Sequence, residues 1–241
     1  MASGDKLSAE ARERRYDIMA DNYKNPVKKI IPSRLETGFQ QFLYKHVGKY
    51  IPESMTPNQV TLIGALGGLF AVVSTLLTHI SPLFFIGTLL GLAVHLVADD
   101  LDGYVARSRN MSSKAGAYFD LITDVLFSTF LMLALGFSPY ANIEVMAFAV
   151  PVYGIVNVTA MNYIIYFNEF LFPRLGPIEA HLTYAAVSVL SMIMGSKTLF
   201  SVLGLDIKIA DLIIFIGLVP TYYEMFRLQI QLFKRLKNEE K

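Results

Sequence analysis

The sequence predicts an all-α membrane protein with six transmembrane helices, an N-terminal amphipathic interfacial helix, and both termini on the cytoplasmic side. Three observations predict this fold class. Hydrophobic residues make up 54% of the chain and the mean hydropathy is +0.44, both high for a soluble protein. Six apolar segments reach the length of about 17–25 residues that a spanning helix needs. The Lys and Arg residues gather on one side of these segments.

The chain divides into three parts. Residues 1–57 are expected to form a cytoplasmic tail and the interfacial helix, residues 58–232 the six-helix transmembrane domain, and residues 233–241 a basic tail. The interfacial helix is expected within Lys28–Tyr50, where apolar residues are interleaved with Lys, Arg and Gln. The same pattern fits a helix packed on the membrane domain, so both interpretations stay open.

The spans are separated by Pro, Gly and Ser, which interrupt helices. They are expected at Gln59–His79, Leu83–Leu101, Gly116–Phe137, Ile143–Tyr166, Glu179–Gly195 and Ile209–Leu228. The loop between the second and third spans carries Arg107, Arg109 and Lys114. The joints on the opposite side carry only Lys197 and Lys208. The positive-inside rule therefore predicts a multi-pass membrane protein whose termini and aspartate loop face the cytoplasm.

The composition also excludes some classes of site. The chain has no cysteine, which excludes a disulfide framework, a thiolate metal site and a cysteine nucleophile. A formal net charge of +1 gives no indication of a nucleic-acid partner, and we expect none. The expected partners are membrane lipids.

Four aspartates lie where the second and third spans approach their shared loop. Asp99 and Asp102 are spaced i, i+3, and Asp120 and Asp124 are spaced i, i+4, so each pair shares one helix face. A turn between the helices lets the two pairs face each other. Four carboxylates so close cannot all stay ionised without cations. Mg²⁺ or Mn²⁺, as one or two ions, is the expected cofactor because both prefer oxygen ligands.

The residues between the aspartates fit an anionic ligand. Gly103 and Gly116 leave the backbone bare, and Ala106 keeps the same face narrow. Arg107 lies one turn beyond and can pair with a phosphate. A metal-bound pyrophosphate is therefore the predicted ligand. Asp100 points off the shared face and is expected to be solvated or bonded to backbone.

This stretch resembles the signature of the CDP-alcohol phosphotransferase (CDP-alcohol phosphatidyltransferase) family. The match runs Asp99-x2-Asp102-Gly103-x2-Ala106-Arg107-x8-Gly116-x3-Asp120-x3-Asp124. The resemblance implies transfer of a substituted phosphoryl group from a CDP-linked donor to an alcohol, with release of CMP. It further implies two divalent ions held by the four aspartates, with Asp124 also acting as the base. By the same resemblance Gly103, Ala106, Arg107 and Gly116 contact the CDP moiety.

Other residues resemble the family less completely. Asn58 follows Pro57 at the start of the first span, where relatives have an asparagine that touches the cytidine; helix capping explains it equally well. The run Gly176–Glu179 resembles an element of the branch that uses CDP-choline or CDP-ethanolamine with diacylglycerol, in which Glu179 would help to activate the acceptor. Leu121 stands where eukaryotic members of that branch have a catalytic histidine.

The sequence therefore favours the diacylglycerol-acceptor branch and leaves the other open. That alternative uses CDP-diacylglycerol with a polar alcohol such as glycerol phosphate, inositol phosphate or serine. The resemblance also implies that a homodimer is possible. Of the four histidines, His95 is one turn before Asp99 and is expected to pack or to support the site, and His181 is expected to pack. A cation transporter and a non-catalytic scaffold are less favoured alternatives, since neither explains Gly103 and Arg107.

Overall fold

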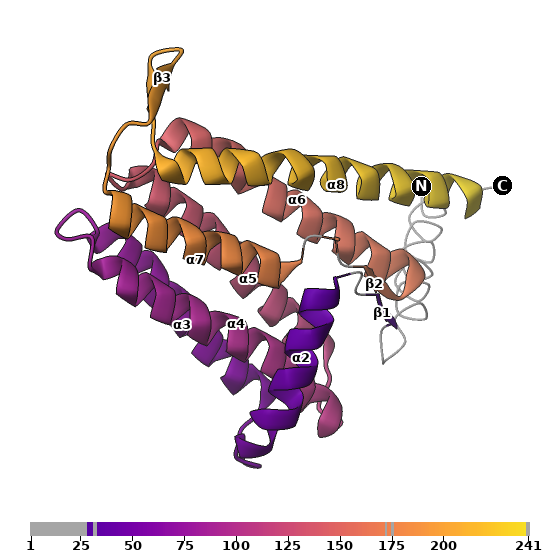
Figure 1. Ribbon diagram of the computed structural model, residues 1–241. Coiled ribbons are helices and arrows are strands. Elements are labelled where there is room, and N and C mark those ends of the chain that lie inside the picture. Colours follow the sequence, from indigo (N-terminus) through magenta and orange to yellow (C-terminus); the bar gives the residue numbers. More distant parts are fainter. Residues whose placement is uncertain (1–27, 31–32, 172, 175, 240–241) are drawn as a thin grey trace, which may run out of the picture.

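The protein is described here as a computed structural model that places residues 28–30, 33–171, 173–174 and 176–239. The N-terminal tail expected before residue 28 lies outside these residues. In chain order the elements are β1 (Lys28–Ile30), α2 (Arg34–His46), the 3₁₀ helix η1 (Gly48–Tyr50), α3 (Pro57–Leu77), α4 (Phe84–Ser108), α5 (Lys114–Phe137), α6 (Ile143–Phe167), β2 (Glu169–Leu171), α7 (Pro177–Met194), β3 (Phe200–Val202), β4 (Leu205–Ile207) and α8 (Ile209–Glu239) (Figure 1).

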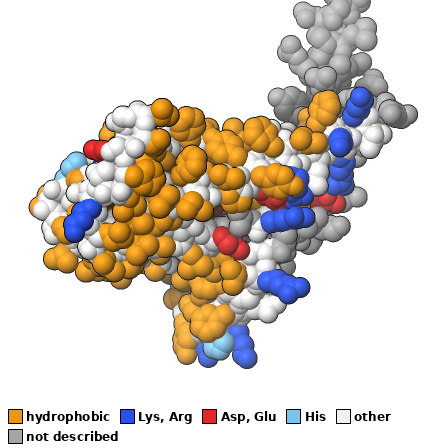
Figure 2. Space-filling view, turned by 45° about the horizontal axis from the view of Figure 1, so that its top comes forward, with side chains coloured by type: hydrophobic (Ala, Val, Ile, Leu, Met, Phe, Trp, Pro, Cys, Tyr) orange, Lys and Arg blue, Asp and Glu red, His pale blue; other side chains and the backbone are white. Residues whose placement is uncertain are grey.

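Among the described residues, six helices are long and apolar enough to cross a membrane: α3, α4, α5, α6, α7 and α8. Together with the N-terminal helix α2 they confirm the predicted all-helical membrane fold, and the side on which the termini lie stays a prediction. Hydrophobic side chains cover much of the molecule's surface, and most Lys and Arg side chains in view lie toward one side of it (Figure 2). This outward apolar cover is the surface that lipid requires.

The helix starts follow local chemistry. Thr56 caps α3 through a capping box with Gln59, and Pro57 occupies the first turn. Ser113 caps α5 by accepting from the Gly116 N–H at 3.0 Å. The second predicted span ended at Leu101, but α4 continues to Ser108. The apolar stretch ends at the aspartates, but the helix continues past them. Residues 99–108 contain no proline, so every residue can donate its backbone N–H to the helix.

Close backbone contact joins α3 to α4. A Cβ placed on Gly91 of α4 would lie 2.5 Å from the Gly67 carbonyl oxygen and 2.6 Å from the Ala71 nitrogen of α3. Small residues permit this approach between membrane helices, where dispersion contacts drive association. This contact holds α4 against α3 about two turns before Asp99. A separate apolar core, including Phe85, Met146 and Val187, fills the end of the bundle away from α2.

The N-terminal segment differs from the prediction of a helix within Lys28–Tyr50. Residues 28–30 form strand β1, which pairs in parallel with β2, and the helix begins only at Arg34, after the Ser33 cap. The helix α2 packs on the membrane domain, with Leu43 buried against α4. Its outward side still exposes Leu35 (59%) and Phe42 (55%). Packing on the domain is therefore confirmed, and this apolar outer side also fits an interfacial position.

The connection between α7 and α8 contains a feature that the sequence analysis did not predict. Strands β3 and β4 form an antiparallel hairpin that projects from the end of the bundle away from α2 (Figure 1). Its turn has positive φ at Leu203 (50°) and Gly204 (81°). The helix α8 runs without a break to Glu239, through the segment expected as a basic tail from residue 233.

Candidate active site

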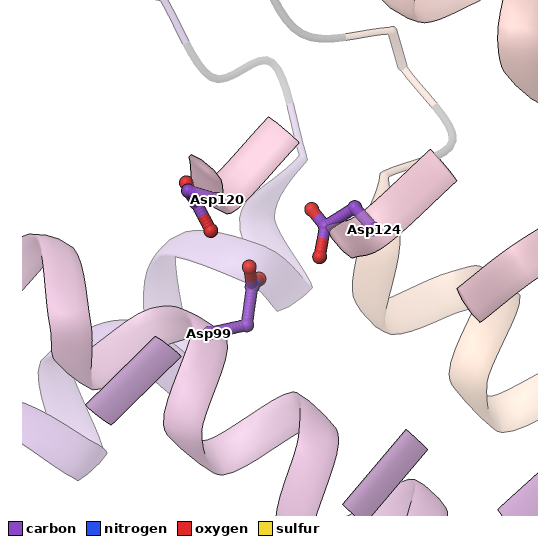
Figure 3. A group of neighbouring side chains, drawn as sticks. All are labelled: Asp99, Asp120 and Asp124. Carbon is purple, nitrogen blue, oxygen red and sulfur yellow. The ribbon is translucent and has the colours of Figure 1, made fainter. Parts of the chain in front are cut away.

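The helices α4 and α5 bring three of the four predicted aspartates together. Asp99 lies on α4, and Asp120 and Asp124 lie one turn apart on α5 (Figure 3). One carboxylate oxygen from each lies within 4.8 Å of the others. The i, i+4 spacing puts the two α5 carboxylates on the same face, which is turned toward α4.

The fourth aspartate, Asp102, lines the same pocket but is held by α3. Its side chain is buried at 5% exposure, and its Oδ2 accepts a hydrogen bond from the Thr61 hydroxyl at 2.5 Å. The pocket is also lined by Gly64 and Ala65 of α3. The sequence had given no sign that Thr61 belongs to the site. The structure places it beside the aspartates, one turn beyond Pro57.

The donor set fits a hard divalent cation. Three half-buried carboxylates from two helices converge, and a fourth lies in the same pocket. Their mutual repulsion in a low-dielectric site is strongly unfavourable unless positive charge is supplied. Oxygen donors select Mg²⁺ or Mn²⁺ over softer metals. The geometry of the cluster is thus consistent with the predicted cofactor.

Two histidines that were expected to pack separately, His95 and His181, lie close to each other beside Asp124. The Nε2 of His95 lies 3.7 Å from Asp124 Oδ1, and its ring stacks on Phe127 with centroids 3.7 Å apart. The ring of His181, from α7, lies 5.4 Å from that of His95. His181 Nδ1 faces the Pro177 carbonyl oxygen at 2.9 Å. The two histidines are far apart in the sequence, and only the contact of α4 with α7 unites them.

Arg107 lies at the exposed end of α4 and bends back over Gly103. A Cβ on Gly103 would lie 2.9 Å from Arg107 Nη1, so a larger residue at position 103 would collide with the guanidinium where it now lies. Arg107 Nη2 donates to the Tyr44 hydroxyl at 3.1 Å. Burial raises the pKa of Tyr44 to about 12, although the neighbouring Arg107 charge opposes the rise. Tyr44 therefore stays a neutral phenol and leaves the positive charge of Arg107 available for an anion.

Two more predicted residues, Asn58 and Gly116, lie close to each other. A Cβ on Gly116 would lie 3.2 Å from Asn58 Oδ1, so the start of α5 touches the start of α3. Asn58 is exposed and faces an open position. Ala106 is half-buried on α4, and its carbonyl accepts from the Met111 N–H at 2.8 Å in the turn before α5. None of Asn58, Ala106 and Gly116 is among the residues that line the aspartate pocket.

Glu179 occupies a different position from the aspartates. Its Oε2 accepts from the Gly176 N–H at 2.8 Å, as a helix-capping acid does. Its Oε1 accepts from the Ser33 hydroxyl at 2.5 Å. Glu179 is not among the residues that line the aspartate pocket. Its carboxylate joins the start of α7 to the start of α2.

Asp100 was expected to be solvated or bonded to backbone, and this expectation was wrong. Asp100 is buried at 6% exposure, and its Oδ1 accepts from Gln40 Nε2 at 2.7 Å. Gln40 also donates to Glu36 at 2.8 Å, and Glu36 accepts from the Ile178 N–H at 3.1 Å. The sequence could not reveal this network because its members come from α2, α4 and α7.

Comparison with known proteins identifies relatives of the chain. The sequence profile of the CDP-alcohol phosphatidyltransferase family matches residues 54–222, which include α3 to α7 and all four aspartates. A protein of Aquifex aeolicus (strain VF5) named "Bifunctional IPC transferase and DIPP synthase" is 30% identical over 118 residues. The aligned part is 48% of this chain and 26% of that protein, so the chain spans about a quarter of that relative's length.

Proposed function

Because the chain belongs to the CDP-alcohol phosphatidyltransferase family, we propose that it transfers phosphocholine or phosphoethanolamine from its CDP derivative to diacylglycerol. It is a membrane transferase of the EC 2.7.8 type by this membership. The cluster of Asp99, Asp120 and Asp124 is the observation that carries the transfer reaction. The diacylglycerol acceptor rests on the Gly176–Glu179 run at the start of α7.

The donor's pyrophosphate binds at the aspartate pocket in this proposal. Asp99, Asp102, Asp120 and Asp124 would hold two Mg²⁺ or Mn²⁺ ions, which neutralise the pyrophosphate and polarise its phosphorus–oxygen bonds. Arg107 pairs with a phosphate from the exposed end of α4. The bare backbone at Gly103 and Gly116, with Ala106 between them, admits the CDP moiety, and Asn58 contacts the cytidine.

Asp124 acts as the base in the transfer step. The acceptor hydroxyl gives its proton to Asp124, its oxygen bonds to the phosphorus that carries the head group, and the bond from that phosphorus to CMP breaks. CMP leaves with the electron pair of that bond. His95, 3.7 Å from Asp124 Oδ1, limits the movement of the carboxylate. Positioning of this kind supports general base catalysis, which contributes about 10²–10⁴-fold.

Two observations favour the alternative reaction, which uses CDP-diacylglycerol and a polar alcohol. Leu121 stands in the sequence where eukaryotic choline-type enzymes have a catalytic histidine, and Glu179 is engaged by Ser33 and Gly176. Both fit an enzyme that instead uses CDP-diacylglycerol and a polar alcohol. In either reaction one substrate carries the lipid, so the site must be reached from the bilayer.

The proposal also assigns a side of the membrane. The basic residues near the aspartates, including Arg107, Arg109 and Lys114, support a cytoplasmic active site. CDP-linked substrates that are water-soluble would enter from that side. A homodimer is the further partner that family resemblance supports.

The test is CMP release by the purified full chain in mixed micelles with Mg²⁺ or Mn²⁺. Three donors are compared: CDP-choline and CDP-ethanolamine with diacylglycerol, and CDP-diacylglycerol with the polar alcohols. Release from the first two supports the proposal, and release only from the third assigns the alternative. Cation flux into proteoliposomes without CMP release from any pair would contradict both and restore the transporter. Asp206→Asn serves as the control for Asp124→Asn, because Asp206 lies on β4, at the end of the bundle away from α2, where its carboxylate accepts from Ser201.

A further inference from the structure

The β3–β4 hairpin has one apolar face and one polar face. The strand register pairs Phe200 with Ile207, Ser201 with Asp206, and Val202 with Leu205. Because side chains alternate along a strand, the first and third pairs share one face and the middle pair occupies the other. On the polar face the Ser201 hydroxyl donates to Asp206 Oδ1 at 2.5 Å. The hairpin is therefore amphipathic along its whole length.

The apolar face and the tip are only partly covered by the protein. Ile207 is buried, but Phe200 is 49% exposed and Val202 is 47% exposed. Leu203, at the turn, is 98% exposed. Its φ of 50° lies in the left-handed region, where Gly, Asn and Asp are the usual residues of such turns. A turn that faced water would favour one of those polar or small residues over leucine.

The hairpin adjoins surface that must face lipid. It follows α7, whose last turn exposes Ile193 (72%), and precedes α8, which exposes Phe215 and Ile216 (62% each). Both helices are membrane spans by length and composition. The apolar face of the hairpin thus continues the lipid-facing surface of its two neighbours. Lys197 is exposed just before the hairpin, where it can reach lipid phosphates.

We propose that the β3–β4 hairpin is a membrane-surface anchor. Phe200, Val202 and Leu203 enter the phospholipid interface of the leaflet away from the aspartate pocket, while Ser201 and Asp206 face water. The location follows from the fold: the hairpin joins the end of α7 to the start of α8, whereas α2 lies at the other end of the bundle (Figure 1). The aspartates lie in the second half of α4, on which α2 packs, and in the first half of α5. A two-stranded hairpin is marginal in water, and burial of its apolar face in lipid stabilises it. The inference does not depend on the transfer reaction.

The absence of tryptophan from the chain gives this proposal a clean fluorescent test. Three single variants, Ser201→Trp, Val202→Trp and Leu203→Trp, are made in the full chain and reconstituted in phosphatidylcholine vesicles. Each is measured with lipids brominated on their acyl chains, which quench from within the bilayer, and with acrylamide, which quenches from water. Neighbouring positions 201 and 202 are matched controls, since they differ chiefly in the face of the strand.

We expect Val202→Trp to be quenched by the brominated lipids at least about twofold more than Ser201→Trp, because the two positions lie on opposite faces of the strand. Leu203→Trp should be quenched as strongly as Val202→Trp, because Leu203 lies at the exposed tip of the hairpin. Acrylamide should show the reverse order. Equal quenching of all three variants by either agent would overturn the proposal. Protection from both agents that disappears when the protein is diluted in lipid would assign the face to a second copy of the chain, which also overturns it.

Discussion

The contact between α3 and α4 predicts the effect of the substitution Gly91→Ala. The added Cβ would lie 2.5 Å from the Gly67 carbonyl oxygen, where ordinary contact begins at 3.4 Å, so the helices must separate by about 0.9 Å locally. The opposing atoms belong largely to backbone and cannot rotate aside. Overpacking of this kind costs roughly 1–3 kcal/mol, and alanine's better helix propensity returns about 0.5–1 kcal/mol. The difference between the midpoints of these two ranges gives an expected net loss of stability of about 1 kcal/mol.

The matched control is Gly217→Ala on α8, where a Cβ meets no atom within 4 Å. There only the helix propensity changes, so we expect a small gain in stability. Thermal unfolding of both purified variants in detergent measures the difference, at roughly 2–4 °C per kcal/mol for a chain of this size. A Gly91→Ala protein as stable as the wild type, or a Gly217→Ala protein equally destabilised, would refute the close-contact reasoning.

Gly91→Ala should also affect the site. Thr61 on α3 donates to Asp102 on α4, so separation of the helices strains this bond two to three turns from the substitution. We expect more Mg²⁺ to be needed for half-maximal CMP release, with little change for Gly217→Ala. If the two variants need the same Mg²⁺ concentration, the α3–α4 contact does not support the pocket.

Three further substitutions test the site and its supports. Asp124→Asn should lower CMP release by about 10²-fold or more, since it removes the proposed base; wild-type rates would exclude that role. Glu36→Gln should cost about 1–3 kcal/mol in the same unfolding assay. The two carboxylate oxygens of Glu36 accept separately from Gln40 and from the Ile178 N–H, whereas an amide has only one oxygen. An unchanged melting temperature would contradict the network. Thr61→Val removes the donor to Asp102 while keeping the side-chain shape, and should raise the Mg²⁺ requirement several-fold, by about 1 kcal/mol for one hydrogen bond; an unaltered Mg²⁺ titration would argue against that contact.

The sequence could predict what depends on local order. Six apolar stretches predicted six long helices, and the spacing of Asp99, Asp120 and Asp124 predicted their convergence. Both follow from helix periodicity, which is a property of neighbours in the chain. The ends of α4 and α8 were less predictable. The apolar pattern shows where a helix leaves the bilayer, but the helix itself can continue into water as long as its backbone hydrogen bonds continue.

Contacts between distant segments could not be predicted in this way. Gln40 was counted among the polar residues of an amphipathic helix, which are usually solvated, and Glu36 was given no role. Both are buried, and only their partners on α4 and α7 explain this. His95 and His181 were likewise treated as separate, because no spacing rule connects residues of α4 and α7. The hairpin β3–β4 was missed since its strands are only three residues long.

The buried network of α2 bears on how the aspartates stay together. Repulsion among the pocket carboxylates would favour a rotation of α4 that carries Asp99 away from α5. Asp100, the next residue, faces the other way and is bonded to Gln40 of α2, while Asp102 is bonded to Thr61 of α3. A rotation of α4 in either sense would break one of these two buried bonds, and each break would leave polar groups unsatisfied at about 1–3 kcal/mol. The helices α2 and α3 thus oppose the electrostatic strain of the site from opposite sides of α4.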